Sequence, residues 1–162
     1  MHAEPTDLDT ATAEAQGELA KLLEALVRQI PGAQWAVLST GDGFKLAVCN
    51  RGVDDADACA AASTGVRASA RQLFKDSPGG VRQVAVEHDD GFCFVMGAGL
   101  ADKKAVGTLL TVMTGRDADP GQAGHEMARF ITGLDEQLVV DARRNGIRRL
   151  GALRNGMRQL EQ

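Results

Sequence analysis

Hydrophobic residues recur at helical spacing at both ends of the central part of the chain. From Glu18 onward the apolar positions follow one helical face, and Pro31-Gly32 ends the pattern. The positions on this face are Leu19, Leu22, Leu23, Leu26, Val27 and Ile30. The last helix of the domain is predicted to begin near Asp119-Pro120, because this pair suits the cap and first position of a helix. Its apolar face comprises Ala123, Met127, Phe130, Ile131, Leu134 and Leu138.

Alternating and continuous apolar runs between these helices predict two β-hairpins and a fifth strand. The first hairpin turns at Gly41-Asp42-Gly43, where we expect a positive φ at Gly43, and the second turns at 88–91. The strands are expected at 35–39, 44–48, 81–87, 92–96 and 105–113. Because the last two strands are apolar on both faces, the sheet should be covered on both sides.

A second helix is predicted between the hairpins, over residues 54–75. Its acidic start places Asp54 as a cap and Asp57 near the positive end of the helix. One apolar stripe of this helix contains Cys59, Ala62, Val66, Ala70 and Leu73. Beside it lies a strip of very small residues, Ala61, Gly65 and Ala68. A mid-helix glycine costs up to about 1 kcal/mol relative to alanine, so the strip predicts close approach of another backbone.

Composition and charge divide the 162 residues into three parts. Residues 1–17 lack a hydrophobic period and are predicted to be a disordered tail, and residues 18–140 are expected to form one domain. Although the net charge is -4, residues 141–162 contain six arginines and are predicted to be a basic amphipathic helix or tail. Two interpretations stay open, a partner-binding arm and a solvated extension. The arm would bind through Arg148, Arg149, Leu150, Leu153 and Met157.

The cysteines indicate a reducing compartment. Cys49, Cys59 and Cys93 are an odd set without C-x-x-C spacing, and no long apolar run or signal-type segment follows the polar start. We therefore expect a cytoplasmic protein in which the three thiols act as small buried apolar groups.

Motifs that would carry chemistry are incomplete. Gly97-Ala98-Gly99 lacks the third glycine of a dinucleotide loop, and His125-Glu126 lacks the second histidine of a zinc-protease helix. No nucleotide-triphosphate loop, EF-hand or nucleophile elbow occurs in the sequence. Aromatic residues make up only 4% of the chain, which argues against nucleic-acid binding by stacking. We therefore expect no enzyme, no catalytic residue, no metal, no cofactor and no nucleic-acid partner.

Four segments point to a family. In chain order they are IPGAQWAVLSTGDGFKLA, DDADACAAASTGVRASARQLF, GGVRQVAVEHDDGFCFVMGAG and DADPGQAGHEMARFITGLDEQL. Their order and spacing resemble the Roadblock (dynein light-chain type) family in its bacterial, actinobacterial-like form, over roughly residues 18–138. The resemblance implies an α/β sandwich of the Roadblock/profilin-like type, with a five-stranded, mostly antiparallel sheet and the order α-β-β-α-β-β-β-α. Two helices would cover one face of the sheet and one helix the other, with the C-terminal helical extension outside the resemblance.

The resemblance also implies a homodimer that acts on or beside small Ras-like GTPases, and it supplies no catalytic residues. Packing supports a dimer independently, because five strands span about 24 Å and a single helix covers only about 10–12 Å of one face. The dimer interface is predicted to contain Ala61, Gly65, Ala68, Val81, Gln83 and Ala85. On the same helix, Arg67 and Arg71 are predicted to bind the partner.

The leading hypothesis is therefore a non-enzymatic homodimeric regulator or scaffold that modulates the nucleotide cycle of a small Ras-like GTPase. Two alternatives remain at this stage. One is a membrane-surface or signalling adaptor, in which the C-terminal arginines contact anionic lipid weakly. The other is a small-molecule-sensing αβ module, which an enlarged apolar cavity between sheet and helix would favour.

Overall fold

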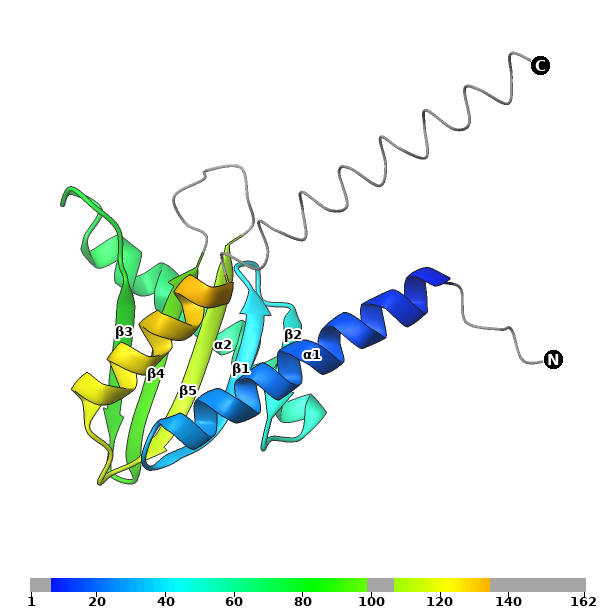
Figure 1. Cartoon of the computed structure of the whole chain (residues 1–162). Helices are drawn as coiled ribbons and strands as arrows, with labels where there is room; N and C mark the ends of the chain where they lie inside the picture. The colour runs from blue at the N-terminus through cyan, green and yellow to red at the C-terminus, as the bar shows by residue number, and fades with distance from the viewer. Residues whose placement is uncertain (1–6, 99–106, 135–162) are drawn as a thin grey trace, which may run out of the picture.

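The computed structural model describes residues 7–98 and 107–134. Two long helices and five strands follow one another along the chain, and a further helix spans residues 120–134 (Figure 1). Their bounds are α1 Asp7–Gln29, β1 Ala33–Thr40, β2 Lys45–Cys49, α2 Val53–Leu73, β3 Gln83–His88, β4 Gly91–Ala98 and β5 Thr108–Gly115. This order confirms the predicted succession of helices and strands.

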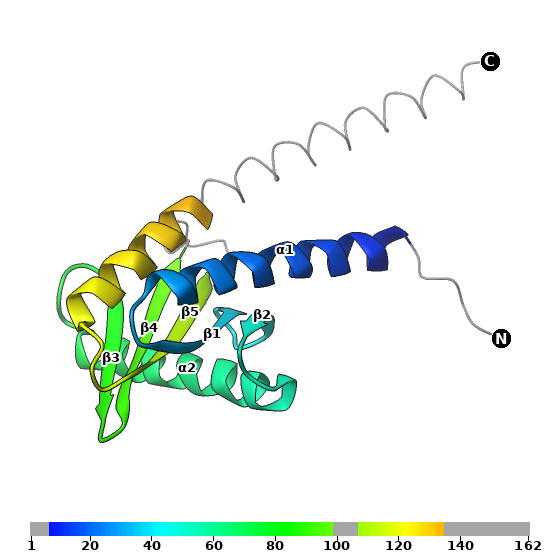
Figure 2. The same cartoon turned by 60° about the horizontal axis from the view of Figure 1, so that its bottom comes forward.

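The strands form one sheet in the order β2-β1-β5-β4-β3, and every neighbouring pair is antiparallel. The strand β5 lies in the middle of the sheet, and its residues 109–112 are buried on both faces. Figure 2 shows α1 and the 120–134 helix on one side of the sheet and α2 on the other. The structure thus confirms the α/β sandwich that the resemblance implied.

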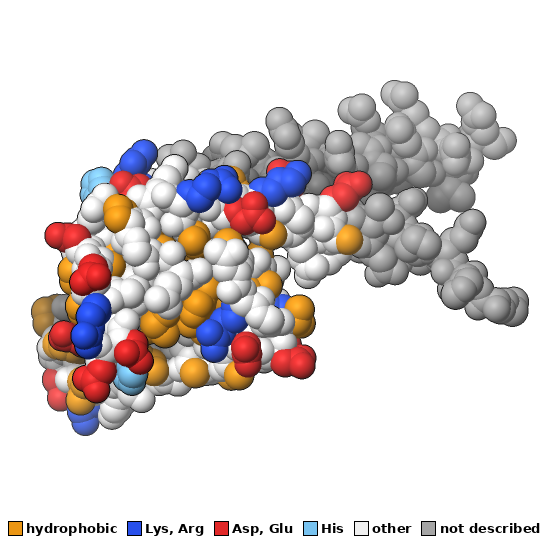
Figure 3. All heavy atoms as spheres, turned by 90° about the horizontal axis from the view of Figure 1, so that it is seen from below, with side chains coloured by type: hydrophobic (Ala, Val, Ile, Leu, Met, Phe, Trp, Pro, Cys, Tyr) orange, Lys and Arg blue, Asp and Glu red, His pale blue; other side chains and the backbone are white. Residues whose placement is uncertain are grey.

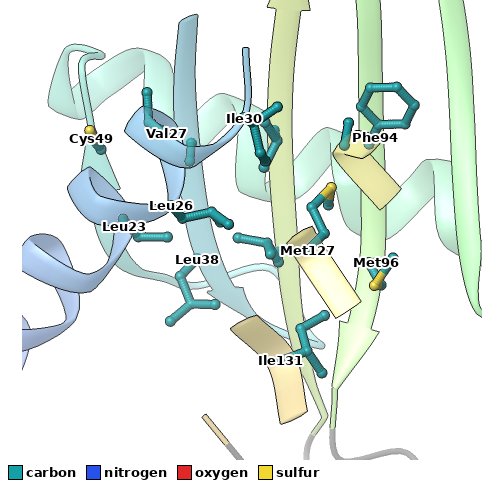
Figure 4. Close-up of a cluster of buried hydrophobic side chains, with 14 of the residues drawn as sticks. Leu23, Leu26, Val27, Ile30, Leu38, Cys49, Phe94, Met96, Met127 and Ile131 are labelled. Atoms are coloured by element: carbon teal, nitrogen blue, oxygen red, sulfur yellow. The ribbon is translucent and has the colours of Figure 1, made fainter. Parts of the chain in front are cut away.

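The main core lies between the sheet and the layer of α1 and the 120–134 helix. Leu23 and Leu26 of α1 belong to one buried cluster with Leu38, Phe94 and other sheet residues (Figure 4). The helical positions predicted from the sequence supply this core, since Leu23, Leu26, Val27, Ile30, Ala123, Met127, Ile131 and Leu134 are all buried. Burying each large aliphatic or aromatic side chain stabilises the fold by about 1.5–3 kcal/mol.

The second core, beneath α2, is made of smaller groups. The helix buries Ala56, Ala60 and Ser63. Ala56 and Ala60 pack against Trp35 and Val37 of β1. None of the five predicted stripe residues belongs to this buried set: three are exposed and two are half-buried, and the exposed ones are Ala62, Val66 and Leu73. The side chains that α2 buries against the sheet are therefore short, and the larger apolar ones of this helix remain outside.

Local backbone geometry confirms the predicted turn of the first hairpin and the predicted start of the last helix. Gly43 has a φ of 98° in the first hairpin turn, where an L-residue would be strained. The 120–134 helix begins as expected, because the Asp119 Oδ1 atom accepts a hydrogen bond from the Gln122 N–H group at 2.8 Å. The predicted cap of α2 is wrong, since its N-cap residue is Gly52 and makes no side-chain capping bond.

The N-terminal part of the chain also differs from the prediction. The helix α1 begins at Asp7, so residues 7–17 are helical and do not form the expected disordered tail. Residues 12–18 are exposed, and the segment is rich in alanine, glutamate and glutamine, which favour helix without burial. Hydrophobic periodicity cannot detect a helix of this kind. Residues 1–6 and the C-terminal segment 141–162 lie outside the described residues.

Candidate protein-interaction surface

The α2 side of the sheet presents apolar side chains to solvent. Leu73 is 83% exposed, Val66 is 37% exposed, and Val86 on the edge strand β3 is 44% exposed. In the view of Figure 3, hydrophobic side chains gather in the middle of the surface and charged side chains surround them. We name the apolar residues of this side, Ala62, Val66, Leu73, Val84 and Val86, the α2–β3 surface.

Two contacts fix how α2 is rotated over the sheet. A Cβ atom on Gly43, in the turn between β1 and β2, would lie 3.5 Å from Ala61 Cα. Cys59, by contrast, packs against the buried cluster that contains Trp35 of β1. Residues four and seven positions after Cys59 lie on the same face of the helix as Cys59. Val66 is therefore on the side of Cys59 and away from Ala61. The apolar stripe therefore borders the part of the sheet that α2 leaves uncovered.

The structure separates the two groups of residues predicted for the dimer interface. Ala61, Gly65 and Ala68 are exposed on α2, on the side of the β1–β2 turn. At the other edge of the sheet, Gln83 and Ala85 lie on β3 and Val81 precedes it. A Cβ atom on Gly124 would lie 3.0 Å from Gln83 Oε1, so Gln83 faces the 120–134 helix and not α2. The interface role of all six residues stays a prediction.

Sequence reasoning missed the residues of β3 that do face α2. In the register with β4, Val84 is opposite Val95 and Val86 is opposite Cys93, whereas Ala85 is opposite the core residue Phe94. Because successive side chains of a strand point to opposite faces, Val84 and Val86 lie on the α2 side. Two valines separated by one residue were the available signal, but their face could be assigned only with the strand order known.

Arg67 and Arg71 lie one turn apart on α2, as predicted. The Nε atom of Arg67 is buried without a hydrogen-bond partner, and neither arginine forms an ion pair within the described residues. Burial, and then the charge of Arg71, lower the pKa of the Arg67 guanidinium. A partly desolvated cation beside a second cation is an unfavourable arrangement that a carboxylate would relieve.

The cysteines are free, and none has the environment of a reactive thiol. Burial raises the pKa of the Cys93 thiol to about 11, with the neighbouring Cys59 adding to the shift. Burial also raises the pKa of Cys59, against a hydrogen bond from Ser63 that lowers it. On the other face of the sheet, burial raises the pKa of Cys49. All three are therefore neutral thiols near pH 7.

Polar contacts also stabilise the packing of α2, and of the segment that precedes it, on the sheet. The Arg51 guanidinium lies 4.3 Å from the centre of the Trp35 ring. The Asn50 side chain, at a residue with a φ of 58°, donates a hydrogen bond to the Gln34 carbonyl. Deeper in the layer, the Ser63 and Thr111 hydroxyl oxygens lie 2.8 Å apart, and Ser63 donates to the Cys59 carbonyl.

A polar cavity of about 270 Å³ lies at the β3–β4 turn. Its lining consists of Glu87, His88, Asp89, Phe92 and Arg116. Arg116 donates a hydrogen bond to the Asp89 carbonyl across it. This lining differs from the apolar cavity that a small-molecule sensor would need. Over residues 7–98 and 107–134, no group of three His, Cys, Asp or Glu side chains is placed to hold a metal ion.

The remaining predicted partner-binding residues fall elsewhere. Arg148, Arg149, Leu150, Leu153 and Met157 all lie outside the described residues. In the part of the chain that the structure describes, no helix combines the length and the apolar character needed to span a bilayer.

Comparison with known proteins agrees with the fold. The sequence matches the Roadblock/LC7 domain family over residues 19–114. A Roadblock/LC7 domain from Streptomyces avermitilis is 34% identical, with a TM-score of 0.67, over 74% of this chain and 97% of that one. A second structure of such a domain from that organism is 26% identical, with a TM-score of 0.56, over 72% and 97%.

A more distant structure shares the fold alone. The gliding protein MglB from Thermus thermophilus is 21% identical, with a TM-score of 0.57, over 74% of this chain and 92% of that one. No curated protein sequence gives a significant match.

Proposed function

This chain belongs to the Roadblock/LC7 family, and on that basis we propose that it is a homodimeric regulator or scaffold without enzymatic activity. Its partner in this proposal is a small Ras-like GTPase, whose nucleotide cycle it modulates. Roadblock relatives act on or beside such GTPases, which is the reason for choosing this partner class. The proposed setting is the cytoplasm, where three free cysteines remain reduced.

The observation that carries the proposal is the incomplete cover on the α2 side of the sheet. One helix lies over this face, and Val66, Leu73 and Val86 remain exposed beside it. Large exposed apolar side chains that adjoin one another are typical of protein-binding surfaces. A second copy related by a two-fold axis would present the same surface and so complete the cover on both copies.

The basic residues of α2 supply the second part of the proposal. Arg67 has a buried Nε atom without a partner, and Arg71 is exposed one turn later. We assign to this pair the contact with a carboxylate of the GTPase, since a guanidinium binds a carboxylate through two parallel hydrogen bonds. The C-terminal arginines would act as an accessory arm that raises the association rate.

A titration with the GTPase tests the proposal. Extracts of the native host are passed over the immobilised protein with GDP or a non-hydrolysable GTP analogue, and the retained GTPase is identified and purified. We expect the full chain to bind its GTP and GDP forms with affinities that differ at least tenfold, because a regulator must distinguish the two states. Equal affinities would remove the regulatory function and leave only a scaffold.

Two variants test the surface against general charge effects. Arg71→Glu should weaken GTPase binding by at least tenfold, because it places a negative charge where a carboxylate is expected to bind. Arg28→Glu makes the same charge change on α1, on the opposite layer, and should leave the affinity within about twofold. If both variants weaken binding equally, α2 is not the contact surface.

The tail is tested by truncation. Deleting residues 143–162 should lower the affinity and flatten its salt dependence, because charge steering is screened beyond about 8 Å at physiological ionic strength. The dimer should persist, since the α2–β3 surface is unchanged. An unchanged salt slope would exclude the tail from binding. Purified protein alone should neither bind nor hydrolyse GTP, and stoichiometric turnover by a pure preparation would contradict the non-enzymatic assignment.

A further inference from the structure

The N-terminal part of α1 projects beyond the sheet (Figure 1). Residues 12–18 are exposed, whereas Leu23 and Leu26 further along the same helix are buried. An exposed helical segment is only marginally stable in water, and Gly17 weakens this one by up to about 1 kcal/mol relative to alanine. We therefore expect another segment to cover this part of α1.

Two half-buried leucines identify the face of α1 that is available. Leu19 packs against the margin of the main core, and Leu22 is half-buried beside it. They precede Leu26 by seven and four residues, so all three lie on one face of the helix. Figure 4 shows Leu26 pointing toward the residues of the 120–134 helix. Ala15, four residues before Leu19, continues this face into the exposed segment.

The described chain ends beside the point where this face becomes exposed. The 120–134 helix runs next to α1 in the opposite direction, and in Figures 1 and 2 its end points toward the projecting part of α1. Leu134, its last described residue, belongs to the same buried cluster against which Leu19 packs. The residues that follow Leu134 therefore start near Leu19, next to the exposed part of α1.

The sequence after Leu134 can continue this helix for eleven residues. Residues 135–145 contain no glycine or proline, and Asn145-Gly146 suits a helix end. Eleven helical residues span about 16 Å, and the twelve residues 7–18 span about 18 Å. The continuation is therefore nearly as long as the part of α1 that precedes Leu19.

We propose that residues 135–145 extend the 120–134 helix and pack antiparallel along residues 7–18 of α1. The exposed face of α1 is thus covered by a segment of the same chain. The two helices form an arm beyond the sheet, and residues 146–162, with the predicted partner-binding residues of the tail, begin at its tip. This inference goes beyond the proposed function and requires no GTPase.

The apolar residues fit this packing. Leu138 follows Leu134 by four residues, and Ala15 precedes Leu19 by four residues, so each continues the apolar face of its own helix. In an antiparallel pair in which Leu134 is level with Leu19, Leu138 comes opposite Ala15. A large side chain then meets a small one, which allows the two helices to approach closely.

The charges fit the same arrangement. Residues 7–18 contain four carboxyl groups and no basic residue. The arginine pair at 143–144 comes level with residues 9–10, in the acidic start of α1. Opposite charges that flank the contact between two helices favour one orientation of the pair. The acidic pair at 135–136 lies at the inner end, within one turn of Lys21.

A disulfide between two introduced cysteines tests the packing. The axes of packed helices are about 8–10 Å apart, so facing Cα atoms are about 3–6 Å apart, which a disulfide can bridge. The full chain carries Ala15→Cys with Leu138→Cys. The matched control carries Ala13→Cys with Leu138→Cys, because Ala13 is equally exposed but lies on the far side of α1, where the Cα atoms would be about 8 Å apart or more.

After mild oxidation and digestion, mass spectrometry measures the linked peptides. We expect at least tenfold more linkage between positions 15 and 138 of one chain than between positions 13 and 138 in the control. Equal linkage of the two pairs would show random encounter and overturn the packing. Linkage found only between two chains would assign this face of α1 to a second copy and overturn it as well.

Hydrogen exchange provides a measurement that needs no introduced cysteine. Leu138→Asp places a charge in the proposed contact and should speed the exchange of the amides of residues 12–18 at least tenfold. Leu150→Asp, the same change in the tail beyond the contact, should leave these rates within about twofold. The amides of residues 23–30 should stay protected in both variants, which shows that the core is still folded.

The result of this exchange experiment is independent of the proposed function. Equal exchange of residues 12–18 in Leu138→Asp and in the unsubstituted chain would overturn the inference, because residues 135–145 then do not cover α1. The GTPase titration tests the proposed function separately, and its failure would leave the two-helix arm standing.

Discussion

The two faces of the sheet bury different kinds of side chain. On the α1 side, Phe94, Leu110 and Met127 are fully buried between the sheet and two helices. On the α2 side, Ala60 and Ser63 lie over the sheet, and a pair of hydroxyl groups occupies the middle of the layer. The same sheet therefore has one aliphatic and aromatic face and one face of small and polar contacts.

The two faces of the sheet therefore have different roles in the stability of the protomer and in binding to other proteins. Burial stabilises in proportion to the apolar area removed from water, at about 25 cal/mol per Å², so the large residues of the α1 side contribute most. Short side chains under α2 contribute less, and they leave larger ones such as Leu73 outside. We infer that the α1 side holds the protomer together, whereas the α2 side is where it meets other proteins.

The largest expected effect is on the α1 side. Phe94→Ala should lower the free energy of unfolding by about 3–5 kcal/mol, because it leaves a cavity in a fully buried cluster. Denaturant unfolding followed by circular dichroism measures the change. Val86→Ala, on the neighbouring strand but exposed, is the matched control and should cost under about 1 kcal/mol. Similar losses for the two variants would contradict the unequal contribution of the faces.

The second effect concerns a thiol on the α2 side. Burial raises the pKa of Cys93 from 9.0 to about 11, so its alkylation at pH 8 should be about 100-fold slower than that of an ordinary thiol. The rate should rise about tenfold per pH unit up to about pH 11. Because the pKa is raised on folding, this thiol stabilises the fold below pH 9, and the contribution is lost as pH rises through about 11.

Mass-mapped iodoacetamide labelling of Cys93 gives the rate. The same protein in denaturant, where the thiol has its ordinary pKa, provides the reference. Equal rates in the folded and unfolded protein would show that solvent reaches Cys93 freely and that the α2 layer leaves this part of the sheet open.

The third effect tests the hydroxyl pair beneath α2. Ser63→Ala should cost about 1–3 kcal/mol, because it leaves the fully buried Thr111 hydroxyl without its partner. Thr111→Val should cost less, since Ser63 still donates to the Cys59 carbonyl. The double variant should be no less stable than Ser63→Ala alone. The free energies of unfolding of the three variants give the coupling energy between the two hydroxyls. If the losses of the single variants add up to that of the double variant, the two hydroxyls act independently.

The smallest effect is expected at the exposed stripe. Leu73→Ser should change the free energy of unfolding of the monomer by less than about 0.5 kcal/mol, because the side chain is already 83% exposed. The same change should raise the dissociation constant of the dimer. Unfolding at a concentration that favours monomers measures the first quantity, and sedimentation equilibrium measures the second. A large loss of monomer stability would mean that the α2 side also holds the protomer together.

Sequence patterns predicted the α1 side far better than the α2 side. In α1, Leu23, Leu26 and Ile30 are large and recur at helical spacing, whereas the other side of the helix contains polar residues such as Lys21, Glu24 and Arg28, so the buried face was evident. In α2 the buried Ala60 and the exposed Ala61 are the same residue type. When small residues surround a helix on all sides, hydrophobic periodicity contains little information about which side packs.

The candidate surface was only partly predictable for a similar reason. Arg67 and Arg71 were identified from their spacing, but the buried Nε atom of Arg67 depends on how α2 is rotated over the sheet. The faces of Val84 and Val86 depend on the order of strands that are distant in sequence. Hydrophobic periodicity likewise could not show that α1 continues to Asp7, since residues 12–18 are exposed and leave no apolar pattern.

The contact between Arg51 and Trp35 gives the protein an optical probe. Trp35 is the single tryptophan, the chain has no tyrosine, and the indole is 9% exposed on the α2 side of the sheet. Its emission therefore comes from this layer alone, blue-shifted by its apolar surroundings and sensitive to the guanidinium 4.3 Å above the ring. The tryptophan emission of the unlabelled protein can thus report whether a second copy or a partner covers the α2 side. Binding on the α1 side would not change this emission directly, because that side contains no tryptophan.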